Sequence, residues 1–177
     1  MERKTKEKTP WFTWMNTTGM HFWTHVEEKW QGKSGLNFYA DGMLQHDHHV
    51  GVLLDKLDEL GIAENTIVIY TGDNGPHACT WPDAAVTWFR SEKVTNWEGA
   101  FRVPGLVRWP NMIEAGSVSN EIIAHLDWVP TLMAAAGDTD VKEKLKKGHE
   151  ADGKKFKVHL DGYNFLPYLT GQEEKGP

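Results

Sequence analysis

Residues 66–75 have the sequence TIVIYTGDNG, and residues 92–104 have the sequence EKVTNWEGAFRVP. The first stretch opens with alternating β-branched residues, which predicts a buried strand over residues 66–71. Asp73 and Asn74 follow that strand, at the edge where open α/β sheets bind their ligands. Their adjacent carboxylate and amide oxygens suit a hard cation such as calcium. Asp, Asn and Gly in a row also favour an ordinary turn, so these three residues alone leave that alternative open.

The second stretch favours the ligand site over the turn. A strand ending in DNG, followed by KxxxWEGxxRVP from Lys93 onward, resembles the second signature of the calcium-dependent sulfatases of the alkaline phosphatase superfamily, GKxxx(W/Y)EGGxRVP. This sequence departs from the family pattern at three places: Gly72 replaces the usual Thr, Ser or Ala, Ser91-Glu92 replaces the glycine before the lysine, and Ala100 replaces the second glycine of EGG. A Cβ at position 100 would crowd a backbone that needs positive φ.

The resemblance implies an α/β fold with a mixed, mainly parallel sheet flanked by helices, of which this chain carries an incomplete copy. Residues 11–15 predict a short aromatic strand, and apolar residues at three- and four-residue steps predict a helix over residues 41–60, closed by Gly61. Together with the strand at 66–71, these elements predict a βαβ unit with two parallel strands and a right-handed crossover.

Histidines supply the next candidates. In the sulfatases a strand like that at 11–15 brings a histidine to the sulfate, and His21 stands at the matching position, with His25 as a weaker candidate. An ordinary loop histidine remains the alternative for His21. His46 and His49 share a helix face and suggest zinc, but no cysteine or distant carboxylate is spaced to complete a tetrahedral site, so a solvated helix surface is the favoured interpretation.

The rest of the chain follows the family order. Residues 76–90 form an aromatic loop that could line a substrate site or fold back as a flap. Asp127 is the expected N-cap of a helix over residues 128–136. Residues 1–10 are a linker or helix tail, residues 138–158 are an expected charged surface connection, and HLDGYNFLPYLTG at 159–171 resembles the family's DGxxLxPxLxG. The whole chain, 1–177, is interpreted as one partial sulfatase catalytic domain.

The resemblance also implies a division of chemical roles. Asp73 and Asn74 would bind Ca²⁺, and Lys93 and His21 would bind the sulfate and act in catalysis. The family's nucleophile is a formylglycine made in a CxPSR motif, which this sequence lacks, because Cys79 lies in CTWPD. We therefore expect a sulfuric ester hydrolase fragment of arylsulfatase type that is inactive by itself. The alternatives are a non-catalytic calcium- or anion-binding fragment and a phosphoesterase of the same superfamily.

Composition limits the partners. The net charge is -6 with both signs interspersed, so no basic footprint for nucleic acid is present. No apolar run approaches the roughly 20 residues of a membrane span, and the charged start of the chain contains no recognisable signal peptide. The expected substrate is a small-molecule or carbohydrate sulfate ester. The resemblance would imply a periplasmic, extracellular or lysosomal protein.

Overall fold

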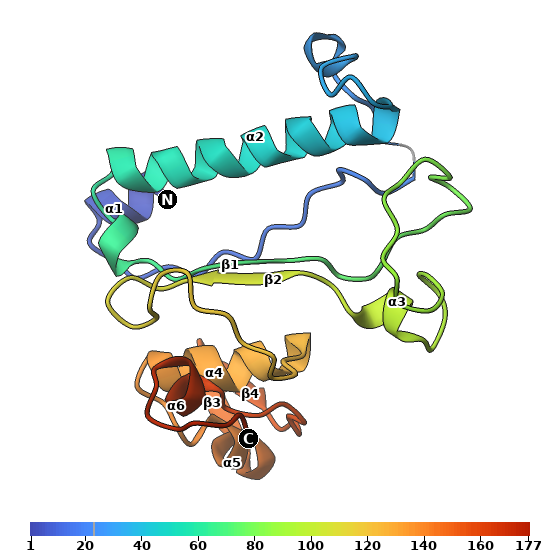
Figure 1. Ribbon diagram of the computed structural model, residues 1–177. Helices are drawn as coiled ribbons and strands as arrows, with labels where there is room; N and C mark the ends of the chain where they lie inside the picture. Colours follow the sequence, from blue (N-terminus) through green and yellow to red (C-terminus); the bar gives the residue numbers. More distant parts are fainter. Residues whose placement is uncertain (23) are drawn as a thin grey trace. The chain divides into compact units, whose positions relative to one another are not determined.

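The computed structural model describes residues 1–22 and 24–177. The chain divides into two compact units, Met1–Pro110 and Asn111–Pro177. In the first unit a long helix, α2, and a strand pair are joined by extended segments and loops (Figure 1). The elements of this unit are α1 (Glu2–Lys6), η1 (Glu28–Trp30), α2 (Phe38–Glu59), η2 (Ala63–Asn65), β1 (Val68–Thr71), α3 (Glu98–Phe101) and β2 (Gly105–Arg108).

Helix α2 confirms the predicted helix and begins one turn earlier than expected. The Asn37 side chain caps it by accepting a hydrogen bond of 2.8 Å from the Ala40 amide. Its apolar stripe is buried unevenly, since Leu57 is 3% exposed whereas Met43 and Leu44 are 38% and 39% exposed. The first unit therefore buries only part of the surface that this helix offers to a core.

The strand pairing differs from the predicted βαβ unit. Strand β1 forms where the sequence predicted a strand, but its partner is β2, which pairs with it antiparallel, with Thr71 opposite Gly105. The expected strand at residues 11–15 is wrong for this structure, which leaves those residues without strand assignment and Phe12 71% exposed. A strand needs a neighbour for its amides and carbonyls as well as an apolar pattern. Among the described residues, none provides that ladder to residues 11–15.

The second unit is built on α4, which confirms the predicted helix. Thr131 of α4 is 1% exposed; it accepts a hydrogen bond of 2.9 Å from the Phe165 amide and so ties the helix to the following segment. Elements of this unit are η3 (His125–Asp127), α4 (Trp128–Ala135), α5 (Val141–Lys147), β3 (His149–Ala151), β4 (Lys154–Phe156) and α6 (Leu166–Leu169).

Asp127 occupies the N-cap position of α4, as predicted, but its side chain does not cap the helix. Asp127 has helical backbone angles, φ -78° and ψ -20°, and makes no side-chain cap bond to α4. An N-cap side chain reaches the helix amides from an extended backbone, which the preceding turn η3 prevents here. The carboxylate instead accepts bonds of 2.7 Å from the Ala124 amide and 2.8 Å from the Tyr163 amide. Asp127 thus links two segments of the second unit.

Residues 138–158 contain α5 and a hairpin that the sequence analysis did not predict. Strands β3 and β4 pair antiparallel around Asp152 and Gly153, whose φ values are 49° and 69°. Two consecutive left-handed residues of this type are the preferred two-residue hairpin turn. The Asp-Gly pair was therefore an available signal.

Candidate functional site

Two backbone hydrogen bonds join the two stretches that define the predicted site. The Gly75 amide donates to the Ala100 carbonyl at 2.7 Å, and the Lys93 amide donates to the Pro76 carbonyl at 2.9 Å. The turn after β1 therefore lies directly against the segment that contains Lys93 and α3. Asp73, Asn74 and Lys93 are brought into one region by main-chain contacts.

Glycines permit this close approach. A Cβ at Gly75 would lie 1.8 Å from the Gly99 carbonyl oxygen, and a Cβ at Gly99 would lie 2.0 Å from the Ser91 carbonyl oxygen. The obstacles are backbone atoms, which cannot turn away as a flexible side chain can. Both glycines are consequently required by packing of backbone against backbone.

Asp73 and Asn74 lie at the end of β1, as the sequence predicted. Asp73 is exposed, whereas Asn74 is partly buried and its Nδ2 donates to the Gly75 carbonyl at 2.9 Å. That bond commits the nitrogen side of the amide and leaves Oδ1 as the donor atom for a cation. A carboxylate and an amide oxygen have the chemistry that calcium prefers. Within residues 1–22 and 24–177, no three His, Cys, Asp or Glu side chains are grouped closely enough to hold a metal ion.

Lys93 is partly buried and lies between two residues with left-handed backbone. Ser91 has φ 66° and Val94 has φ 71°. Positive φ is a genuine outlier for a β-branched residue such as valine. The chain therefore adopts a costly conformation on both sides of the predicted sulfate-binding lysine.

Two of the three departures from the family pattern, Ala100 and Gly72, fit the structure. Ala100 lies in α3 and has no positive φ, so the crowding expected from its Cβ does not arise. A Cβ at Gly72 would make an ordinary contact of 3.5 Å with the Cβ of Val103, so a small side chain would also fit there.

His21 lies in a turn that is closed by hydrogen bonds from Thr24. Its carbonyl accepts bonds from the Thr24 amide at 3.2 Å and the Thr24 hydroxyl at 2.6 Å, and its exposed ring lies 4.0 Å from that of Phe22. No hydrogen bond in the described part of the chain connects His21 to Asp73, Asn74 or Lys93. The structure thus joins three of the four predicted residues.

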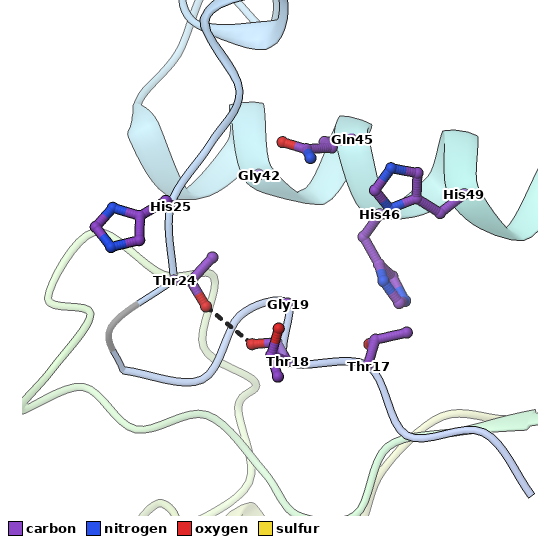
Figure 2. Close-up of a pocket in the computed structure, with 9 residues that line it drawn as sticks. All are labelled: Thr17, Thr18, Gly19, Thr24, His25, Gly42, Gln45, His46 and His49. Carbon is purple, nitrogen blue, oxygen red and sulfur yellow. Dashed lines mark hydrogen bonds between the residues drawn. The ribbon is translucent and has the colours of Figure 1, made fainter.

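A polar hollow lies between this turn and α2 (Figure 2). His25, the weaker histidine candidate, lines it and His21 does not. The His46 ring points toward Thr17, and its Nε2 lies 3.0 Å from the Tyr70 hydroxyl. The sequence analysis missed this link between α2 and β1, because His46 was considered only as a surface residue or zinc ligand. The residues lining the hollow are Thr17, Thr18, Gly19, Thr24, His25, Gly42, Gln45, His46 and His49.

The aromatic loop has two parts with different environments. Trp81 stacks on Phe38 with ring centroids 6.0 Å apart and meets Tyr39 edge-on at 5.6 Å, so this part folds back on the start of α2. Burial, and then the neighbouring Tyr70 and Asp83, raise the pKa of Tyr39. Trp88, by contrast, is 93% exposed. The flap interpretation holds for the first part of the loop only.

The family comparison agrees with these motifs. The family model described as Sulfatase matches residues 2–138. Human arylsulfatase H is 32% identical over 173 residues, which cover 94% of this chain and 28% of the relative. The chain thus spans little more than a quarter of that relative's length.

Solved structures give the same result. The crystal structure of PsFucS1 sulfatase from Pseudoalteromonas sp. matches with a TM-score of 0.70 and 31% identity over 84% of this chain and 28% of that one. Ps i-CgsB in complex with k-i-k-neocarrahexaose matches with a TM-score of 0.61 and 29% identity over 76% of this chain and 26% of that one. This likeness confirms the predicted α/β, alkaline-phosphatase-like fold class. The chain belongs to the sulfatase family.

Proposed function

We propose that this chain forms the calcium- and sulfate-binding part of a sulfuric ester hydrolase. The observation that supports it is the pair of backbone bonds, Gly75 to Ala100 and Lys93 to Pro76, which join the oxygen donors after β1 to the lysine segment. A cation site and an ammonium group in one region would provide the two positive charges that hold a sulfate. Its ester would be that of a small molecule or a carbohydrate, since Ps i-CgsB, whose structure is similar, was solved in complex with k-i-k-neocarrahexaose.

The residues take distinct roles in this proposal. The Asp73 carboxylate and the Asn74 Oδ1 hold Ca²⁺, which when bound draws charge from the sulfate as a Lewis acid. Lys93 places its ammonium group against the sulfate and the ester oxygen. His21 binds the same group and protonates the departing alcohol. The remaining calcium ligands and the nucleophile come from outside these 177 residues, which contain no CxPSR sequence.

Calorimetry on the purified chain tests calcium binding. We expect weak binding, with a dissociation constant of about 10⁻⁴–10⁻³ M, because two of the six to eight oxygen ligands that calcium takes are present. Asp73→Ala should abolish the calcium heat, whereas Asp55→Ala, which removes an exposed carboxylate from α2, should retain it. Equal calcium heats from the two variants would refute the assignment.

Sulfate binding has its own matched pair of variants. Lys93→Ala should weaken binding of inorganic sulfate, and Lys33→Ala, which removes the same charge from an exposed position in the same unit, should not. An equal loss in both variants would mean that only net charge matters. Inorganic phosphate as competitor separates the phosphoesterase alternative, since a sulfatase site should prefer sulfate.

A further inference from the structure

The segment that leads into Lys93 presents an unusual aromatic surface. Trp88 is 93% exposed and meets Phe89 edge-on, with ring centroids 6.1 Å apart. A tryptophan with almost its whole surface in water contributes little to folding, because burial is what makes a large aromatic ring stabilising. Its exposure leaves a broad ring face available to a ligand.

Two guanidinium groups lie over aromatic rings in this part of the chain. The guanidinium carbon of Arg90 lies 3.6 Å from the centroid of the Trp97 ring, and that of Arg102 lies 4.3 Å from the centroid of the Phe89 ring. Stacking fixes the guanidinium plane and leaves its N–H groups at the edges for planar anions. Arg102 also pairs with Glu98 at 3.4 Å. Arg90 is exposed.

This surface is joined to the candidate site by the backbone. The Gly99 amide donates to the Arg90 carbonyl at 2.8 Å, and Gly99 is the glycine that packs under Gly75. Arg90 and Lys93 are therefore both held by backbone bonds, Arg90 to Gly99 and Lys93 to Pro76. We call Trp88, Phe89, Arg90, Trp97 and Arg102 the aromatic–guanidinium face.

We propose that the aromatic–guanidinium face binds the sugar part of a sulfated carbohydrate, a proposal that rests on the proposed sulfate site and narrows its substrate class. A pyranose ring has an apolar C–H face that stacks on an open indole ring, and hydroxyl groups around it that stay in water. A second sulfate on the carbohydrate pairs with the Arg90 guanidinium. A wholly apolar ligand would instead need an enclosed pocket, which the exposed Trp88 ring does not provide.

Binding measurements on the full chain test this assignment. The probes are a sulfated galactose oligosaccharide, the same oligosaccharide without sulfate, 4-nitrophenyl sulfate and inorganic sulfate. Trp88→Ala should weaken binding of the sulfated oligosaccharide about two- to tenfold, which is the range expected for one aromatic stacking contact. The same change should leave the affinity for inorganic sulfate unchanged. Trp14→Ala is the control, because Trp14 is also well exposed, at 61%, and its indole N–H donates to the Asn16 side chain of its own segment.

The outcomes separate this proposal from the sulfate site. The proposal is supported if Trp88→Ala selectively lowers the affinity for the sulfated oligosaccharide and Arg90→Lys lowers it less. Equal affinities in Trp88→Ala and Trp14→Ala overturn it, and so does a loss confined to 4-nitrophenyl sulfate. Inorganic sulfate binding that does not depend on Lys93 would refute the proposed function instead. Because Trp88 is exposed, its replacement should leave the melting temperature unchanged, so misfolding does not explain a loss of binding.

Discussion

The Gly75 amide donates a hydrogen bond of 2.7 Å to the Ala100 carbonyl, and this contact organises the candidate site. It fixes the turn after β1 against α3, so that the two halves of the family signature, distant in sequence, lie together. No side chain takes part in the bond. The site's geometry therefore depends on how closely the two backbones can approach.

Gly75→Ala should destabilise the chain by about 2 kcal/mol or more, because overpacking against fixed atoms forces the backbone apart. The added Cβ would lie 1.8 Å from the Gly99 carbonyl oxygen. Urea unfolding measures the loss. Gly51→Ala is the control, since a Cβ there meets nothing within 4 Å. That change lies inside α2 and should stabilise by roughly 0.5–1 kcal/mol, as alanine replaces glycine in a helix. A Gly75→Ala chain as stable as the parent would contradict the close packing.

Val94→Gly should stabilise the chain by about 1 kcal/mol, the lower end of the cost of a left-handed non-glycine residue. Val94 has φ 71° and is 86% exposed, so the substitution relieves backbone strain and gives up almost no buried surface. Thermal unfolding of both proteins checks it. Val118→Gly, at a position 87% exposed without positive φ, should instead lower the melting temperature, because glycine makes the unfolded chain more flexible. A decrease for Val94→Gly as large as that for Val118→Gly would show that no strain is stored there.

The sequence predicted those parts of the fold that depend on local patterns. Periodicity predicted α2, a cap residue at its start predicted α4, and β-branched alternation predicted β1, because each signal lies within or next to one element. Residues 11–15 have the same kind of apolar pattern but no strand, since pairing depends on a neighbour that the pattern does not specify. The capping bond expected from the Asp127 side chain is absent for a similar reason, because it depends on backbone angles that η3 sets.

Some features of the candidate site could likewise be predicted from local sequence patterns, and others depend on the fold. Asp73, Asn74 and Lys93 could be chosen from contiguous motifs, and their roles stay predictions. The stacking of Arg90 on Trp97 could not be predicted, because it depends on the fold of the segment between them. The left-handed backbone at Ser91 and Val94 also could not be predicted from the sequence, since neither residue type favours positive φ.

The stability of the first unit should depend on Asp41 in acid. Its carboxylate accepts bonds of 2.7 Å from the Gly32 amide and 2.8 Å from the Ser34 amide, and hydrogen bonding from Ser34 and then Gly32 lowers the pKa of Asp41 below its ordinary 3.8. A lowered folded pKa gives stability that is present above the unfolded pKa and is lost as the pH falls through the folded value.

Asp41→Asn should therefore lower the melting temperature at pH 7 and reduce its further decline below about pH 4, where the parent loses the charged form. Thermal melts at several pH values between neutrality and acid measure both effects. Asp55→Asn, on the exposed side of the same helix, should follow the parent's curve. Parallel curves for Asp41→Asn and the parent would show that these hydrogen bonds do not favour the charged carboxylate.

The last prediction is that the 177-residue chain alone hydrolyses no sulfate ester. Sulfatases use a covalent nucleophile, which divides one difficult displacement into two easier ones. Cys79 is the sole cysteine of the sequence, is exposed, and lies in CTWPD, which lacks the Pro-Ser-Arg that follows the family's cysteine. Removing the nucleophile and several metal ligands together leaves little activity, because such groups act as a unit.

Purified chain with saturating calcium and 4-nitrophenyl sulfate should accordingly release nitrophenol at the rate of buffer alone. Calcium-dependent release that Lys93→Ala abolishes and Cys79→Ala leaves intact would reveal a nucleophile outside the recognised motif. Release that disappears in Cys79→Ala would make Cys79 itself the nucleophile. In that case the thiol must reach the sulfate, although its Sγ lies 4.0 Å from the Glu92 Oε1 in this structure. That carboxylate would repel the thiolate that a nucleophilic cysteine needs, so we expect neither result.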